Sequence, residues 1–191
     1  MIKLSILILT TPRRLETFFP RLIRHLEKQI GSRTDVEILG LYDNKKRTVG
    51  EKRNELIKMA KGKYLTFIDD DDRIDDTYIE TILKMIEERP DADCIVFDCI
   101  TTINNDPNQV TYSKYGIEFN YHQTGNQWRG KPAHTMVWLS DITKRHSYVS
   151  KNYGEDIDWV VRACRDIKTQ VRIDKVLYYY DFNSAVSETR G

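Results

Sequence analysis

The chain has 191 residues, of which 40% are hydrophobic and 31% are charged, and its formal net charge is +1. This length suits one domain with a real hydrophobic core. The near-zero net charge excludes a global field that would attract nucleic acid or an acidic membrane. The cysteines, Cys94, Cys99 and Cys164, are odd in number and lack metal-ligand spacing. We therefore expect no disulfide framework and a reducing compartment, the cytoplasm.

The first hundred residues alternate between apolar runs and helical patterns. Continuous apolar runs typical of strands buried on both faces cover residues 3–9, 36–41, 64–68 and 94–100. The first run is too short to span a membrane and lacks a signal-peptide cleavage site. Helical spacing predicts helices over about 15–29, over 48–60 and before Pro90. Thr48 and Glu51 form a capping box at the start of the second helix.

This order of strands and helices predicts an α/β fold, a three-layer α/β/α sandwich with a mostly parallel sheet. Thr10, Asp43 and the run Asp69–Asp72 follow successive strands. Ligand loops of such folds gather at the carboxyl ends of the strands, so we expect these residues to lie close together.

The second half of the chain is less regular. We expect an antiparallel strand over 110–115, a long loop over 116–132 and a strand over 134–139. Helices follow at about 140–146 and 154–167, and a last strand at 171–180. The polar tail from residue 183 is expected to be loose, and the whole chain, 1–191, to form a single domain.

Four consecutive acids, Asp69–Asp72, directly follow the strand at 64–68. At about 5 Å and an effective dielectric constant of about 20, each like-charge pair costs roughly 3 kcal/mol. A divalent cation would offset this repulsion, because Mg²⁺ and Mn²⁺ prefer carboxylate oxygens. A cation at this edge of an α/β sheet indicates a phosphate or diphosphate substrate. The alternative is a solvated turn whose acids favour the start of the next helix.

Four blocks in the expected order resemble the GT-A glycosyltransferases, and most closely family 2 of that class. They are residues 3–13, Asp43, residues 50–54 followed by 62–72, and residues 154–159. The resemblance covers about residues 3–182 and implies a Rossmann-like nucleotide-binding sheet. It also implies a nucleotide-sugar-binding half over 1–100 and an acceptor-side half over 101–182.

The resemblance assigns five residues to the nucleotide-sugar donor. Thr10 matches the threonine whose backbone approaches the base, and Thr11 stands where a tyrosine often stacks on it. Asp43 matches the acid that hydrogen-bonds the nucleobase imide, a contact that favours uracil; alternatively it only forms a turn. Arg13 and Arg53 could assist at the diphosphate, or could be solvated surface charges.

The resemblance also assigns the metal site. Asp69 would face the ribose or the base-proximal groups, and Asp71 would bind the Mn²⁺ or Mg²⁺ that bridges the diphosphate. Asp70 and Asp72 could share either role, because a run of four acids hides the register. His134 could approach the metal or the diphosphate, or could be structural.

On the acceptor side, Asp156 is the expected general base and Glu155 the second candidate. The chemistry needs a carboxylate that takes the proton of the attacking hydroxyl. Alternatively, both acids only favour the dipole at a helix start. Asp158 and Trp159 would pack against or shape the acceptor pocket, and Trp128 lies in the expected loop, either on the acceptor side or in simple loop packing.

We therefore expect a metal-dependent glycosyltransferase that moves a hexosyl or pentosyl group from a nucleotide diphosphate, with UDP as the expected nucleotide. One base opposite the leaving group implies inversion. The acceptor would be a glycan or a soluble acceptor, including hydroxymethylated DNA bases. The alternatives are a nucleotidyltransferase that acts on a sugar phosphate and a non-catalytic nucleotide-sugar-binding module. The sequence determines neither the sugar nor the oligomeric state.

Overall fold

The computed structural model describes residues 1–185. Of the tail expected to be loose, only residues 183–185 are described, and there the Ser184 N–H donates to Asn104 Oδ1 at 2.9 Å. Residues 186–191 lie outside the described part of the chain.

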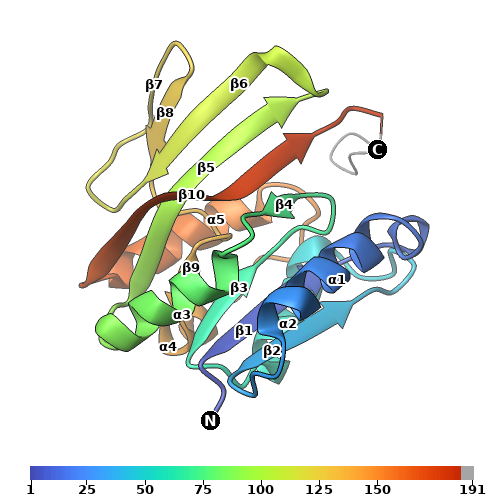
Figure 1. Cartoon of the computed structure of the whole chain (residues 1–191), viewed down its shortest axis with the longest axis vertical. Coiled ribbons are helices and arrows are strands. Elements are labelled where there is room, and N and C mark those ends of the chain that lie inside the picture. Colours follow the sequence, from blue (N-terminus) through green and yellow to red (C-terminus); the bar gives the residue numbers. More distant parts are fainter. Residues whose placement is uncertain (186–191) are drawn as a thin grey trace.

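The fold is built on one mixed sheet, with the strands in the order β2-β1-β3-β9-β5-β6-β8-β7 and with β10 paired to β5 and β4 (Figure 1). The strands are β1 (Leu4–Leu9), β2 (Val36–Leu41), β3 (Tyr64–Phe67), β4 (Arg73–Ile74), β5 (Cys94–Ile103), β6 (Asp106–Tyr115), β7 (His122–Thr124), β8 (Gln127–Gly130), β9 (Val137–Leu139) and β10 (Gln170–Phe182).

The central part of the sheet is mostly parallel, as expected. Strand β1 pairs in parallel with both β2 and β3. Strand β9 is antiparallel to β3 and to β5, so β5 runs in the same direction as β3. Strand β10 then pairs in parallel with β5. Five strands thus run one way, with β9 reversed among them, and β1, which lies between β2 and β3, is almost wholly buried.

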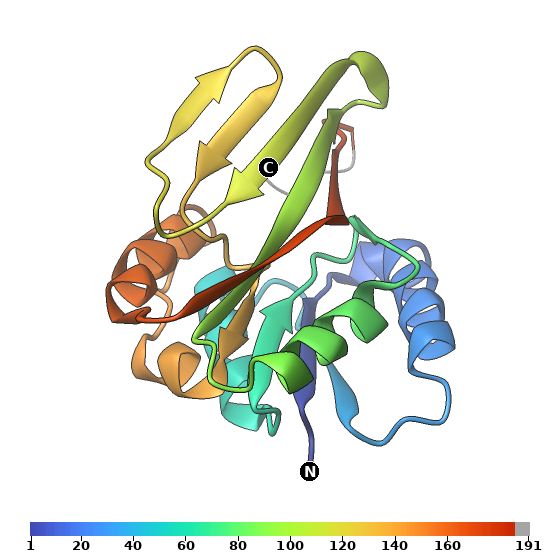
Figure 2. The ribbon, with the colours of Figure 1, turned by 60° about the vertical axis from the view of Figure 1, so that its left-hand side comes forward.

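Two helical layers cover this sheet (Figures 1 and 2). The helices are α1 (Phe18–Ile30), α2 (Val49–Met59), α3 (Tyr78–Glu88), α4 (Ser140–Arg145) and α5 (Glu155–Ala163), with short 3-10 turns η1 (Pro12–Arg14) and η2 (Cys164–Asp166). Helix α1 packs against α3, whereas α2 contacts α4 and α5. The three-layer α/β arrangement expected from the sequence is therefore present.

Local signals explain where the first helices begin. The capping box of α2 is formed: Thr48 Oγ1 accepts a hydrogen bond from the Glu51 N–H, and Glu51 Oε2 accepts one from the Thr48 N–H. Helix α1 begins at Phe18 rather than near residue 15, because the chain first makes the η1 turn. Pro20 therefore lies in the first turn of α1, where its missing N–H breaks no helical hydrogen bond.

The prediction of one long loop over 116–132 was wrong. Part of that segment forms the hairpin β7–β8, and β8 pairs in parallel with β6. Gly125, at a φ of 57°, provides the positive dihedral that the hairpin turn needs. Both strands are largely exposed, so they lack the apolar alternation that predicts a strand from sequence.

Among residues 1–185, the longest apolar helical stretches fall short of what a bilayer-spanning helix requires.

Candidate functional site

The expected site residues of the first half lie at one edge of the sheet. Strands β1, β2 and β3 are parallel neighbours, so their carboxyl ends meet there (Figure 2). The Thr10 N–H donates to the Leu41 carbonyl at 3.0 Å, which joins the end of β1 to the end of β2. Asp43 follows β2, and the run Asp69–Asp72, here called the acid turn, follows β3.

The four carboxylates of the acid turn have different environments. Asp70 and Asp72 are buried, with side chains 1% and 2% exposed, whereas Asp69 and Asp71 are 33% and 19% exposed. The Tyr178 hydroxyl donates to Asp72 Oδ2 at 2.6 Å, and the Asp181 N–H donates to Asp72 Oδ1 at 3.1 Å. Asp72 therefore anchors the turn to β10 and is not positioned to bind a donor.

Arg14 supplies the positive charge that the acid turn needs, and it was not among the residues expected from the sequence. Its Nη1 donates to Asp70 Oδ1 at 2.7 Å, and its Nη2 donates to Asp71 Oδ2 at 2.8 Å. Burial raises the pKa of both carboxyls, and the Arg14 guanidinium opposes that rise. Arg13, the expected residue, is exposed instead.

The reason for this difference is the η1 turn. Pro12 begins a 3-10 turn directly after β1, and Arg14 closes it, so Arg14 rather than Arg13 faces the acid turn. The sequence contained the signal, because proline favours the first position of a helical turn. Which of the two arginines, Arg13 or Arg14, faces the acid turn depends on where β3 ends in space. The local sequence around Pro12 does not specify that position.

Arg53 joins the acid turn to the acids at the start of α5, Glu155 and Asp156, which lie far from the turn in the sequence. It is buried on α2, with Nη2 3.5 Å from Asp69 Oδ1 and Nε 3.3 Å from Glu155 Oε1. Its guanidinium stacks over the Phe67 ring, 4.8 Å from the centroid. Burial raises the pKa of Glu155, and the charge of Arg53 opposes this rise. A buried charge pair of this kind fixes the position of α5 against the acid turn.

His134 lies between the same two motifs. Its Nε2 is 3.9 Å from Asp69 Oδ2, and its Nδ1 is 3.5 Å from Asp156 Oδ2. Burial, together with the Arg53 charge, lowers the pKa of His134 to about 4, so the ring is neutral at pH 7. Its Nε2 is buried and has no hydrogen-bond partner among the described residues. His134 thus presents an unused ring nitrogen toward Asp69.

Asp43 and Thr11 carry further unused oxygens. Asp43 Oδ2 accepts hydrogen bonds from the N–H and the Nε of Arg47 at 2.9 and 2.8 Å. Asp43 Oδ1 is 3.7 Å from Lys52 Nζ. That oxygen and Thr11 Oγ1 are buried without a hydrogen-bond partner in the described part of the chain. Buried polar atoms are normally satisfied, so both oxygens are candidates for ligand contacts.

The expected acceptor-side residues divide into two groups. Asp156, at the start of α5, lies beside His134, as described above. Trp159 is 1% exposed, stacks on Tyr148 and donates from Nε1 to the His146 carbonyl, so it packs in the core. Asp158 instead pairs with Arg162 on the outer side of α5.

Trp128 lies on the β7–β8 hairpin and packs against Tyr115 and Tyr121, with ring centroids 5.0 and 6.0 Å apart. No described contact joins it to the acid turn.

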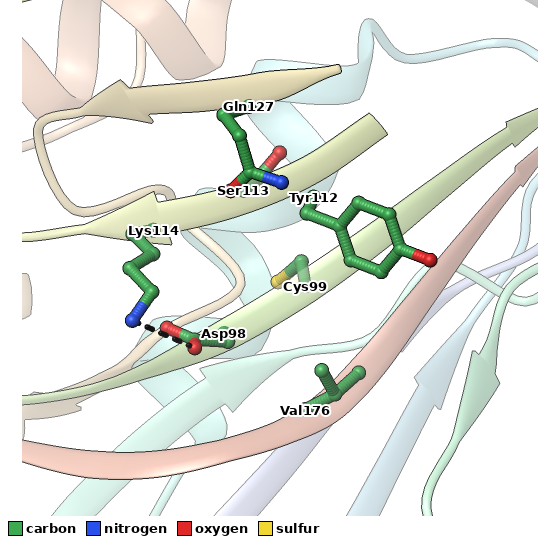
Figure 3. A pocket seen from close by; sticks show the side chains of 7 residues that line it. All are labelled: Asp98, Cys99, Tyr112, Ser113, Lys114, Gln127 and Val176. Carbon is green, nitrogen blue, oxygen red and sulfur yellow. Dashed lines mark ion pairs between the residues drawn. The ribbon is translucent and has the colours of Figure 1, made fainter. Parts of the chain in front are cut away.

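A cavity of about 140 Å³ lies beside this hairpin, between β5, β6, β8 and β10 (Figure 3). Lys114 points toward Asp98 in its wall. None of the expected site residues lines this cavity, so it is separate from the acid turn.

Comparison with known proteins identifies the family and the fold. The model of the family described as "Glycosyl transferase family 2" matches residues 28–148. The S. aureus TarS 1-349 structure in complex with UDP is 16% identical and has a TM-score of 0.71, covering 94% of this chain and 60% of that one. The corresponding complex with UDP-GlcNAc is 15% identical, with a TM-score of 0.66, covering 94% of this chain and 58% of that one.

At 15–16% sequence identity, the comparison with TarS shows a shared fold and no more. The chain spans 60% or less of the length of these TarS structures. No curated protein sequence is significantly similar to the chain.

Proposed function

The chain belongs to glycosyl transferase family 2, and from this membership we propose that it transfers a sugar from a UDP-linked donor to an acceptor hydroxyl, with inversion at the anomeric carbon. One observation carries the proposal. Arg53 and His134 bring the acid turn and the acids of α5 to one place, with contacts of 3.3 to 3.9 Å. Carboxylates with separate roles are what such a transfer requires.

The nucleotide is proposed to lie across the ends of β1 and β2. The buried Asp43 Oδ1 has no hydrogen-bond partner among the described residues and can accept the imide N–H of uracil. Thr11 Oγ1, which follows β1 and is likewise buried without a partner among the described residues, offers a second contact. UDP and UDP-GlcNAc occupy the similarly folded S. aureus TarS, which supports UDP as the nucleotide. The sugar is a hexosyl or pentosyl group.

The residues of the acid turn fit a divalent cation. No group of three or more metal-ligating side chains is preformed among residues 1–185. This suits Mg²⁺ or Mn²⁺, which is commonly held by one or two carboxylates plus the phosphates of the substrate. Asp71 would hold the ion, and the unpartnered His134 Nε2 is a further ligand candidate. When bound, the ion would neutralise charge on the leaving diphosphate.

Asp156 is proposed as the general base. Its carboxylate is partly exposed, and the neutral His134 can donate its Nδ1–H toward Asp156 Oδ2, which would orient the carboxylate. Asp156 would take the proton of the attacking hydroxyl on the side opposite the leaving group. Glu155 is buried against Arg53, so it positions α5 and is not available to an acceptor.

The acceptor is proposed to be a glycan hydroxyl, because glycans are the usual acceptors of family 2. A hydroxymethylated DNA base would be a distinct outcome of the acceptor test. Transfer to DNA would require affinity for the phosphate backbone, and therefore a steep dependence on salt. Acceptor screens at two salt concentrations would separate these substrates.

The test of donor binding is thermal shift with UDP, with Mn²⁺ and with both. We expect Mn²⁺ to enhance the stabilisation by UDP, and Asp71→Ala to abolish that enhancement. Asp76→Ala is the matched control, because Asp76 is another acid of the same segment but its side chain is 90% exposed. An enhancement that survives in Asp71→Ala would refute the role of Asp71.

Product analysis tests the reaction itself. A glycosyltransferase that hydrolyses UDP-sugars slowly in the presence of Mn²⁺ releases UDP, whereas a nucleotidyltransferase given UTP and a sugar phosphate releases pyrophosphate and forms the UDP-sugar. Activity with UDP-sugars should also fall strongly in Asp156→Asn, because an amide cannot accept the proton. Full transfer by Asp156→Asn would exclude Asp156 as the base.

A further inference from the structure

Arg14 is the most unusual feature of the site, because its guanidinium binds Asp71 Oδ2, an oxygen that a bound cation would need. One guanidinium bridges two carboxylates, Asp70 Oδ1 at 2.7 Å and Asp71 Oδ2 at 2.8 Å. Arg14 and both acids are largely buried, so these contacts are poorly screened. The proposed metal ligand, Asp71, is therefore already neutralised by the protein itself.

We propose that Arg14 is a displaceable counter-ion, which holds Asp71 in the absence of donor and releases it when a divalent cation arrives together with a nucleoside diphosphate. The inference rests on the proposed function and names a positioning residue for it. It implies that the divalent cation binds tightly only together with the nucleoside diphosphate. The cation alone meets a neutralised turn and binds weakly, whereas the cation with the diphosphate offers Arg14 a new partner.

The backbone of the acid turn has supports other than Arg14. Arg21 Nη2 donates to the backbone carbonyls of Asp71 and Asp72 at 2.9 and 3.0 Å. Asp72 is held by Tyr178 and by the Asp181 N–H, as described above. Arg14, in contrast, donates to carboxylate oxygens of the turn, Asp70 Oδ1 and Asp71 Oδ2. Arg14 can therefore change partner while the backbone of the turn stays in place.

The position of Arg14 also suits a change of partner. It closes the short η1 turn at the end of β1, beside the proposed nucleotide site. Its guanidinium stacks on the Phe18 ring at 5.7 Å, and Arg21 stacks on the same ring at 5.4 Å. A planar guanidinium binds phosphate oxygens in the same bidentate way as carboxylates. A diphosphate can thus replace Asp70 and Asp71 as its ligand.

The test is Mn²⁺ binding to the full chain, measured from the electron paramagnetic resonance signal of free Mn²⁺, with and without UDP. Removing a charge about 5 Å from the ion should tighten Mn²⁺ binding without nucleotide by at least about tenfold in Arg14→Gln, because about tenfold is the effect expected even at the dielectric constant of water and these groups are less screened. The same variant should bind UDP more weakly at saturating Mn²⁺. Arg24→Gln removes one exposed charge from α1 and should change neither quantity.

If Arg14 were instead a fixed support of the acid turn, the effect of Arg14→Gln on Mn²⁺ binding would differ. In that case Arg14→Gln would bind free Mn²⁺ equally well or more weakly, and this result would overturn the inference. Because Asp70 is buried, Arg14→Gln could unfold; the double variant Arg14→Gln with Asp70→Asn removes the unpaired buried charge and is judged by the same criterion. If the unmodified protein binds no Mn²⁺ even with UDP, the proposed metal role fails together with this inference.

Discussion

The hydroxyl of Tyr178 connects the acid turn to β10, and its removal is a sharp test of how that turn is held. The hydroxyl donates to Asp72 Oδ2 at 2.6 Å and accepts the Asp69 N–H at 3.1 Å. Tyr178 and Asp72 are each 2% exposed, so water cannot replace either contact without rearrangement. Tyr178→Phe deletes one oxygen and keeps the ring.

The expected cost follows from these two contacts. A hydrogen bond to a buried charged group contributes about 2 kcal/mol, and leaving the Asp69 N–H unsatisfied adds about 1 kcal/mol. We therefore expect Tyr178→Phe to lower the free energy of unfolding by about 3 kcal/mol. Tyr78→Phe is the matched control, because its buried hydroxyl pairs with the neutral Thr66 Oγ1 at 3.0 Å and should cost only about 1 kcal/mol.

Equilibrium unfolding in urea at pH 8 and pH 5 measures both variants. Burial and the nearby Asp69 raise the pKa of Asp72 well above its usual value. An acid with a higher pKa in the folded state takes up a proton on folding, so its ionisation destabilises the fold as pH rises. Loss of the Tyr178 donor raises that pKa further, and the penalty of Tyr178→Phe should be larger at pH 8 than at pH 5.

Equal penalties for Tyr178→Phe and Tyr78→Phe at pH 8 would refute the reasoning. They would mean that Asp72 is not held as a charged acceptor in the folded state. A penalty for Tyr178→Phe that does not change with pH would lead to the same conclusion.

Two further predictions concern α5 and its partner α2. Arg53→Met should lower the unfolding free energy by about 3–5 kcal/mol at pH 8, because Glu155 then remains buried without its charge partner. The loss should be smaller at pH 5, where Glu155 can take up a proton, and a pH-independent loss in urea unfolding would contradict this. Trp159→Ala should cost about 3–5 kcal/mol because it leaves a core cavity. Asp158→Ala should cost less than about 1 kcal/mol, since its ion pair is at the surface; thermal unfolding that ranks these two variants the other way would place Trp159 outside the core.

The first half of the fold could be predicted from the sequence because its signals are local. Residues 36–41 form a strand with the predicted bounds, and the Thr48 capping box forms as expected. Parallel strands buried on both faces leave continuous apolar runs, and helix caps use neighbouring residues. The convergence of Thr10, Asp43 and Asp69 at one edge follows from strand direction alone.

The second half depended on contacts that the sequence does not display. The β7–β8 hairpin forms from exposed, polar residues, so no periodic pattern distinguishes it from a loop. On α5, Glu155 is buried whereas Ile157 and Val161 are exposed, so the polarity of single residues does not identify the buried face. The buried face of that helix is set by Arg53 and Tyr148, which belong to other segments.

The sequence by itself determined that acids gather at the carboxyl end of a buried strand, because strand burial and residue order are properties of one short segment. Only the tertiary structure decided what each acid does. Arg14, Arg53 and Tyr178 come from three other elements and give Asp69–Asp72 four different environments. The strength of a charge interaction depends on distance and burial, and both are fixed only when those elements pack together.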